Sequence, residues 1–251
     1  MLDYDLEAAD YDQTRGGAER AQAAAGAVLE LVPAGTRVLV DVACGTGIVS
    51  ELLTAPDRMV LGVDPSAGML ELARPRLGGD GRAMRGDATR LPLADGSVDA
   101  VTFMWLLHLL DEAVVTAAIA EAARVLRPGG VLVTTVNKNT AQFDSPSDVG
   151  AVLGAAYREY VPVPSDDFDR VRGIAAAVGL ELAGTSGYVG HNQGKSPRQW
   201  VELLHGESGW SRRATAEQIA EICQAVAELP DQDVRRGDPV YKLAGFRLAG
   251  D

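Results

Sequence analysis

The sequence has few of the residues that mark disulfide-bonded, metal-bound or membrane proteins. Its only cysteines, Cys44 and Cys223, are too few for a disulfide framework or a structural zinc site, and they suit a reducing compartment. The three histidines show no HxH or HExxH spacing, so we expect no metal. No apolar run is long enough to span a bilayer, and the acidic N-terminus lacks the apolar core of a signal peptide. These absences predict a soluble cytoplasmic protein.

Positive charge is also scarce. Lysine and arginine number 23 against 35 aspartates and glutamates, which gives a formal net charge of -12. Such a field repels phosphate backbones and argues against a nucleic-acid partner, whereas a small or cationic ligand fits it. The hydrophobic content of 47% is sufficient for a well-buried core, and no linker marks a boundary, so we expect a single domain over residues 1–251.

Helical and extended patterns alternate through the first half of the chain. The apolar spacing predicts helices over residues 21–32, 64–77 and 111–126, and strands over residues 37–42, 59–64, 82–88, 98–105 and 131–136. Ser66 stands where it can cap the second helix. Repeated βαβ units predict a doubly wound α/β fold, with a mostly parallel sheet covered by helices on both sides.

The rhythm changes after Val136. A helix is expected over residues 168–178, a strand over 179–189, one long helical stretch over 197–229 and a last strand over 240–249. The last two strands are too far apart in the chain for a tight hairpin. The residues between them are therefore expected to pack away from the sheet, over the ligand.

The stretch VLVDVACGTGIVS, residues 38–50, runs from a strand into a turn with two glycines. Gly45 and Gly47 let the backbone turn sharply and approach a ligand closely. Ser50 stands where the dinucleotide fingerprint has its third glycine, so the pyrophosphate motif is incomplete. Asp41, just before the turn, would oppose a pyrophosphate and favour an ammonium group. A turn that only links strand to helix is the alternative.

Two further acidic positions suit an adenosine group. Asp64 ends the second strand, 17 residues beyond Gly47, where a carboxylate can accept both ribose hydroxyl protons. Asp87 and Ala88 follow the short strand RAMRGDA, where a carboxylate could take the adenine amino group and a backbone N–H could reach a ring nitrogen.

The ordered set DVACGTG, VDPSAGML, GDATRLPLADGSVDAV and RVLRPGGVLV, within about residues 38–136, resembles the class I S-adenosylmethionine-dependent methyltransferases. More narrowly, it is similar to the branch that modifies small molecules, including quinone, sugar and antibiotic methyltransferases. The resemblance implies a Rossmann-like, seven-stranded sheet with an antiparallel last strand, helical lid elements over the site, and S-adenosylmethionine across the carboxyl ends of the strands.

The resemblance also implies roles for single residues. The positions it places around the cofactor are Ala43, Gly45 and Gly47 at the methionine group, Asp41 beside the turn, Asp64 at the ribose, Met69 at the adenine face, Asp87 and Ala88 at the adenine edge, and Met104 near the end of the fourth strand.

The N-terminal arm, residues 1–20, resembles the segment that folds over the cofactor in this family. Tyr11 and Arg15 are four residues apart and would share a helix face, so that the tyrosine could close the pocket and the arginine could meet a carboxylate. A surface tail is the alternative interpretation.

His108, in MWLLHLL, is the candidate catalytic base, because members of this family place groups near the methyl group after the fourth strand. An unperturbed imidazole pKa of about 6.5 suits proton removal near neutrality. Packing or capping is the competing role. Trp200 falls at core spacing with Leu203 and Leu204, while Trp210 could line an acceptor chamber.

The sequence thus predicts a methyltransferase acting on an oxygen or nitrogen of a small molecule, such as a secondary metabolite of antibiotic biosynthesis. Residues 1–20 form the arm, 21–136 the cofactor-binding core and 137–251 the substrate-shaping half. Three alternatives to methyl transfer remain open: sulfonium-dependent cyclisation, a cofactor-binding accessory subunit, and a dehydrogenase.

Overall fold

The structure is a computed structural model that describes residues 11–14, 16–144, 146–161, 163–206 and 209–250. Its strands are β1 (Val38–Val42), β2 (Met59–Asp64), β3 (Ala83–Arg85), β4 (Val98–Phe103), β5 (Leu126–Val136), β6 (Leu180–Val189) and β7 (Val240–Leu248). Its helices are α2 (Tyr11–Thr14), α3 (Gly17–Leu29), α4 (Ile48–Leu53), α5 (Ala67–Leu77), α6 (Glu112–Val125), α7 (Ala141–Asp144), α8 (Asp148–Tyr160), α9 (Phe168–Ala177), α10 (Pro197–His205) and α11 (Ala216–Ala227). Short 3-10 turns are η1 (Asp80–Arg82), η2 (Leu107–Leu109) and η3 (Gly209–Arg213).

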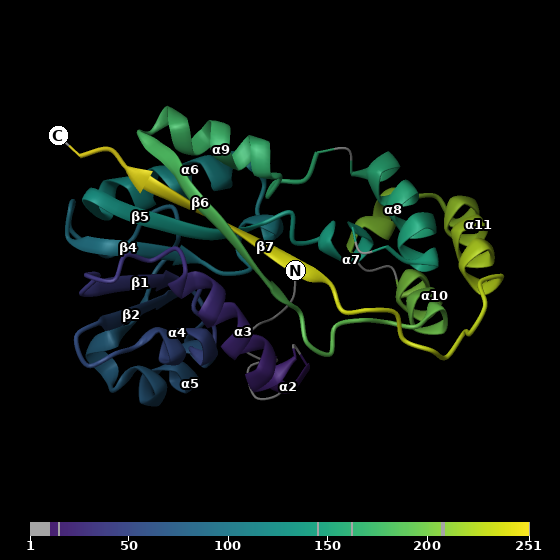
Figure 1. The fold of residues 1–251 in the computed structure, drawn as a ribbon, viewed down its shortest axis with the longest axis horizontal. Helices are drawn as coiled ribbons and strands as arrows, with labels where there is room; N and C mark the ends of the chain where they lie inside the picture. Colours follow the sequence, from purple (N-terminus) through teal and green to yellow (C-terminus); the bar gives the residue numbers. More distant parts are fainter. Residues whose placement is uncertain (1–10, 15, 145, 162, 207–208, 251) are drawn as a thin grey trace.

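The strands form one seven-stranded sheet in the order β3-β2-β1-β4-β5-β7-β6. The pairs from β3 to β5 are parallel, while β7 pairs antiparallel with both β5 and β6. The predicted Rossmann-like sheet with an antiparallel last strand is therefore confirmed. Because the parallel strands run the same way, their carboxyl ends meet at one edge, which faces the helices at the right of Figure 1.

Alternating side chains of the sheet enter two apolar layers. In β1, Leu39 packs on the side of α3, α4 and α5, and Val40 packs on the side of α6 and α9. The two helical layers are seen below and above the sheet in Figure 1. Helix starts follow the sequence signals: the Ser66 hydroxyl accepts from the Met69 N–H, as predicted, and Asp111 accepts from the Val114 N–H to cap α6.

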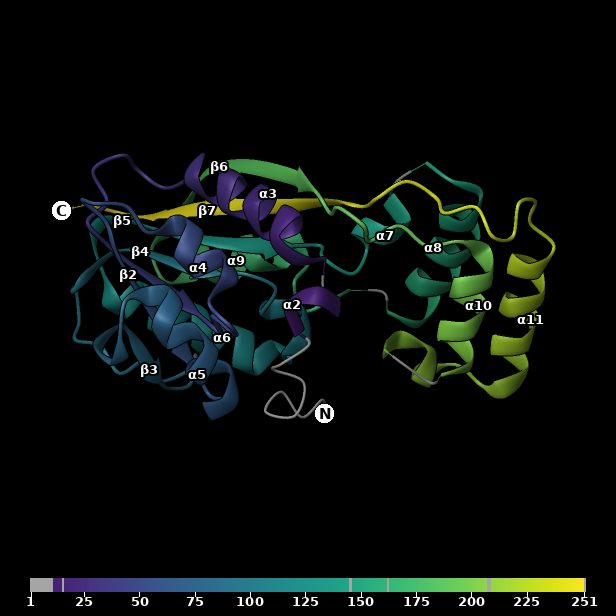
Figure 2. The same cartoon turned by 90° about the horizontal axis from the view of Figure 1, so that it is seen from below.

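Helices α7, α8, α10 and α11, together with η3, form a helical lobe beyond the carboxyl edge of the sheet (Figure 2). The lobe has its own apolar cluster of buried side chains, which includes Phe143, Leu153 and Val226. The chain between β6 and β7 supplies α10 and α11 to it, so this segment packs away from the sheet as predicted.

Several boundaries differ from the sequence-based expectation. Strand β5 begins at Leu126 and not at residue 131, so residues 126–130 are already extended. The stretch 197–229 is not one helix, because it divides into α10, η3 and α11, and the last of these starts at a capping box of Thr215 and Gln218. Strand β3 spans only three residues, so Asp87 and Ala88 lie in the following turn. Strand β4 ends at Phe103 because Trp105 has a left-handed backbone, with φ of 54°.

None of the helices in the described part of the chain has the length and apolar character that crossing a membrane requires.

Candidate active site

The glycine turn after β1 has the backbone that only glycine adopts readily. Gly45 and Gly47 have φ of 56° and 77°, and Gly47 is the N-cap of α4. A Cβ at Gly47 would lie 3.1 Å from the backbone of Ala73 in α5, so the turn also needs a small residue for helix packing. The two glycines therefore bring bare backbone to the carboxyl edge of the sheet.

Asp64 ties this turn to the end of β2. Its carboxylate accepts the Gly45 N–H at 2.8 Å and the Ser66 N–H at 2.9 Å, and the side chain is buried. A carboxylate offers about four acceptor positions, so holding these two groups is compatible with a hydrogen bond to a ribose hydroxyl. The geometry fits the role that the resemblance implies for Asp64.

Asp41 is buried between β1, α4 and β4, with only 2% of its surface exposed. Its carboxylate accepts the Ser50 hydroxyl at 2.5 Å and the Thr102 hydroxyl at 2.7 Å. Burial raises the pKa of Asp41 to about 6, although the two hydroxyl bonds oppose this shift. Ser50, at the third position of the glycine motif, thus has a structural role: it holds Asp41 below the turn.

The remaining positions implied for the cofactor lie along the same edge. Met69 is buried in the first turn of α5, and its Sδ would be 4.0 Å from a Cβ on Gly45. Asp87, exposed in the turn after β3, accepts both the hydroxyl and the N–H of Thr89, which lower its pKa. Ala88 is half-buried beside it, and Met104 is buried after β4.

Backbone strain gathers at this edge too. The non-glycine residues Ala43, Trp105 and Asn137 have φ of 57°, 54° and 52°, and they follow β1, β4 and β5. A left-handed backbone is costly for alanine and tryptophan, and such conformations cluster at functional sites. Three neighbouring strands therefore end in constrained turns at the place where the sequence predicts the ligand.

The N-terminal arm reaches the glycine turn through a residue that the sequence analysis missed. Asp12 in α2 accepts the Thr46 hydroxyl at 2.6 Å and pairs with Arg76 of α5 at 2.8 Å. Arg15 and the side chain of Tyr11 lie outside the described residues. The contacts of Asp12 place α2 beside the proposed cofactor site, where a lid would have to lie.

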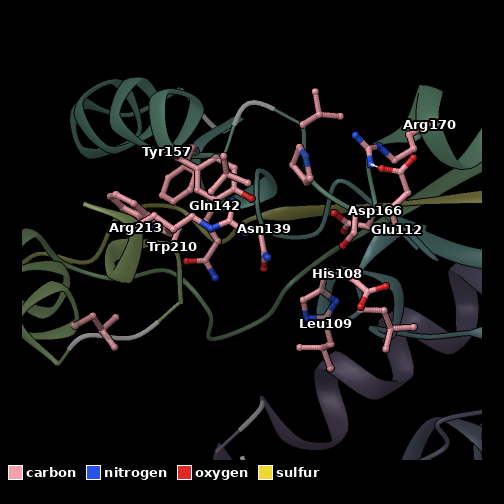
Figure 3. Close-up of a pocket in the computed structure, with 18 of the residues that line it drawn as sticks. His108, Leu109, Glu112, Asn139, Gln142, Tyr157, Asp166, Arg170, Trp210 and Arg213 are labelled. Carbon is pink, nitrogen blue, oxygen red and sulfur yellow. Dashed lines mark hydrogen bonds and ion pairs between the residues drawn. The ribbon is translucent and has the colours of Figure 1, made fainter. Parts of the chain in front are cut away.

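A cavity of about 780 Å³ lies between the carboxyl edge of the sheet and the helical lobe (Figure 3). Of the residues that the sequence singled out for the cofactor or for catalysis, His108 lines it and the cofactor residues do not. Because β4 lies next to β1 in the sheet, the segment after β4 borders both this cavity and the glycine turn.

His108 is held at the cavity by its neighbours in η2. Leu107 is fully buried under it, whereas Leu109 is 57% exposed. The preceding Trp105 is fixed from two sides, because its N–H donates to the Thr135 hydroxyl and its indole Nε1 donates to the Tyr188 hydroxyl. The Arg20 guanidinium lies 4.0 Å from the Trp105 ring centroid. The backbone just before the turn of His108 is thus held by contacts of Trp105 with β5, β6 and α3.

Aromatic side chains of the helical lobe form the opposite wall. Phe143 lies 5.2 Å from Tyr157 and 5.7 Å from Trp200, and Tyr157 lies 6.1 Å edge-on from Trp210, by ring centroids. Trp200 packs on the lobe cluster, as its core spacing predicts, and it also lines the cavity. Trp210 also lines the cavity, whereas His191 and His205 are exposed and do not line it.

A known protein family matches the part of the chain that carries the residues implied for the cofactor. Residues 40–134 match the family model described as a methyltransferase domain. A demethylmenaquinone methyltransferase of Mycobacterium sp. (strain KMS) is 39% identical over 128 residues, which are 51% of this chain and 49% of the relative. The ubiquinone/menaquinone biosynthesis C-methyltransferase UbiE of Desulfotalea psychrophila is 41% identical over 99 residues, 38% of this chain and 39% of the relative. The chain spans about half the length of the first of these relatives, and less of the second.

Similar folds cover the chain more completely. A methyltransferase of Haloferax volcanii, solved with the Trm112 methyltransferase activator, has a TM-score of 0.61 over 100% of this chain and 99% of that chain, at 20% identity. The resemblance predicted from the motifs is confirmed over residues 40–134, which match the methyltransferase-domain model, and the cofactor that this match implies is S-adenosylmethionine. In the described part of the chain, no cluster of histidine, cysteine, aspartate or glutamate side chains could hold a metal ion.

Proposed function

We propose that this chain transfers the methyl group of S-adenosylmethionine to a small-molecule acceptor bound between the sheet edge and the helical lobe. One observation carries the proposal. The segment after β4 lies beside the glycine turn and also presents His108 to a cavity of about 780 Å³, a size that suits a drug-sized molecule.

The chain's own groups would divide the work. Gly45 and Gly47 would admit the methionine end of the cofactor, Asp64 the ribose, and Asp87, Ala88, Met69 and Met104 the adenosine side. Asp41, buried below the turn, would supply negative charge opposite the cofactor's ammonium group. When bound, the cofactor supplies an electrophilic methyl group, and most of the acceleration would come from positioning the acceptor against it.

His108 would remove the acceptor's proton where the nucleophile is a hydroxyl or an ammonium. We expect an oxygen or nitrogen acceptor, in line with this role. The relatives named for demethylmenaquinone and for C-methylation make a ring carbon the second candidate, and the aromatic wall of Phe143, Tyr157, Trp200 and Trp210 suits a planar ring.

The arm completes the proposal. With Asp12 bonded to Thr46 and Arg76, α2 lies where residues 1–16 could cover the cofactor and exclude water. Removal of residues 1–16 should leave the sheet folded and reduce cofactor retention and turnover together; a truncated chain with full activity would exclude the lid.

The function is tested by incubating the purified chain with S-adenosylmethionine and a panel of phenols, amines and hydroquinones, followed by mass spectrometry. Acceptor-dependent formation of S-adenosylhomocysteine, with a product heavier by one methyl group, supports transfer. Product formation without S-adenosylhomocysteine would favour a cyclase, and preferential binding of a nicotinamide cofactor would favour a dehydrogenase.

A further inference from the structure

Asp166 is a buried carboxylate on the wall of the cavity that the cofactor site does not use. The side chain is 1% exposed, and it lies on the sheet side of the cavity, across from Tyr157 and Trp210 (Figure 3). It stands in the segment that returns from the helical lobe to α9. No sequence signal marks it, because in SDDFD it stands next to Asp167, which caps α9.

Backbone contacts fix Asp166 at the end of β5. Its Oδ2 accepts the Lys138 N–H at 2.7 Å, and its own carbonyl accepts the Asn137 N–H at 2.8 Å. One residue earlier, the Ser165 hydroxyl donates to the Leu107 carbonyl at 2.8 Å, which joins this segment to the turn of His108. Asp166 and His108 therefore belong to one braced wall.

The second oxygen of Asp166 has a different environment. Among the described residues, Oδ1 has no hydrogen-bond partner, and it is shielded from bulk water. A buried acceptor without a partner is costly, and native proteins seldom retain one without a reason. Burial also raises the pKa of the Asp166 carboxyl, with the Lys138 N–H opposing the shift.

The rest of the cavity narrows the kind of partner. The opposite wall is aromatic, and three apolar side chains that line the cavity, Leu109, Val163 and Leu203, are exposed, which favours an apolar ring. Among the side chains that line the cavity, Lys195, Arg213 and Arg170 balance Asp111, Glu112 and Asp166, so the charge of the lining does not favour a cationic acceptor.

We propose that Asp166 selects the acceptor: its Oδ1 accepts a hydrogen bond from a hydroxyl group on a neutral aromatic molecule seated against the aromatic wall. The donor must enter between the side chains that line the wall, so a terminal hydroxyl suits it. This inference rests on the proposed function in so far as it calls the bound molecule the methyl acceptor. Binding of that molecule to Asp166 can be measured without turnover.

The test compares two probes with the same ring, catechol and its dimethyl ether veratrole, by calorimetric titration. A hydrogen bond to a buried carboxylate of about 1.4 kcal/mol predicts that the wild-type chain binds catechol about tenfold more tightly than veratrole. In Asp166→Asn the amide oxygen keeps the Lys138 N–H, and the amide NH₂ faces the cavity. The methoxy and hydroxyl oxygens can both accept from that NH₂, so the preference should fall below about twofold.

Asp111→Asn is the matched control. Asp111 lines the same cavity and caps α6, a role that asparagine also fills, so this variant should keep the tenfold preference. Equal affinities of the wild-type chain for the two probes, or no binding of catechol, would overturn the inference even if the variant did not fold. So would an Asp166→Asn variant that keeps the preference.

Benzylamine, a cationic aromatic probe, is the third ligand in the test. If it binds the wild-type chain more tightly than catechol and loses that advantage in Asp166→Asn, the partner is an ammonium group and the hydroxyl assignment is wrong. A catechol preference that depends on Asp166, in a chain that forms no S-adenosylhomocysteine with any acceptor, would instead uphold the inference and contradict the proposed function.

Discussion

The two sides of the candidate active site are built by different means. The sheet side is formed mainly by backbone: Gly45, Gly47 and the N–H groups held by Asp64 lie where parallel strands end. On the lobe side, aromatic side chains from α7, α8, α10 and η3 make a wall around their own apolar cluster. Backbone geometry restricts the sequence narrowly, whereas an apolar wall accepts many residues. The first side should therefore be general to the cofactor, and the second specific to the acceptor.

The largest effect is expected where the two sides meet. His108→Ala should lower turnover by about 10² to 10⁴-fold if His108 removes a proton, and leave S-adenosylmethionine affinity nearly unchanged. The wild-type rate should rise with pH through the range where an imidazole loses its proton, and the variant should lack this limb. His205→Ala, exposed in the lobe, is the control. Matching pH profiles for the wild type and His108→Ala would reduce His108 to a packing residue.

Asp41 gives the next effect, and it concerns stability. Because burial raises its pKa from 3.8 to about 6, the folded state binds the proton more tightly, and stability is lost as pH rises through this window. Above it the charged carboxyl costs on the order of 3 kcal/mol. Asp41→Asn, whose amide can serve both hydroxyls, should melt at higher temperature than wild type at about pH 8 and at a similar temperature at about pH 4.

Asp99 is a control of opposite sign. Although burial opposes it, the Val38 N–H and the Arg127 guanidinium hold its pKa below the usual range. Its contribution is present above the unfolded-state pKa and is lost as pH falls, so Asp99→Asn should lower the melting temperature at neutral pH. If the melting temperatures of Asp41→Asn and the wild type differed by the same amount at every pH, the buried charge of Asp41 would have no such cost.

Asp64 tests the sheet side directly. Asp64→Ala should weaken S-adenosylmethionine binding by about 1.5–3 kcal/mol, because it removes both the implied ribose contact and the anchor of the Gly45 N–H. Calorimetric titration measures the loss. Asp57→Ala, an exposed aspartate before β2 at the far edge of the sheet, should bind normally. Unchanged affinity in a folded Asp64→Ala variant would remove the ribose assignment.

The smallest effect belongs to the lobe. Trp210→Leu removes one ring from the wall, where it stacks on Tyr160 with centroids 6.1 Å apart. It should weaken veratrole binding by about 0.5–1.5 kcal/mol and leave S-adenosylmethionine affinity unchanged. Val234→Ala, exposed and outside the cavity lining, should affect neither. Loss of cofactor affinity in Trp210→Leu would mean that the two sides are not separate.

Much of the fold followed from local patterns. Alternating apolar residues gave the strands, and Ser66 marked the start of α5 correctly. The prediction of a single long helix over 197–229 was wrong. The apolar spacing continues across η3, but the capping box at Thr215 starts a new helix, α11. Capping signals are short, and a continuous apolar pattern hides them.

The sequence alone indicated the class, because the glycine turn and Asp64 stand at regular places in repeated βαβ units and the ordered motifs resemble those of the methyltransferases. It also named His108. Only the tertiary structure decided what faces His108: Phe143, Trp200, Trp210 and Asp166 come from segments far apart in the chain. Their spacing looks like ordinary core and capping until the packing of the lobe leaves one side of each against a cavity. The physical reason is that burial depends on the whole fold, whereas a strand, a turn or a cap is specified by its neighbours.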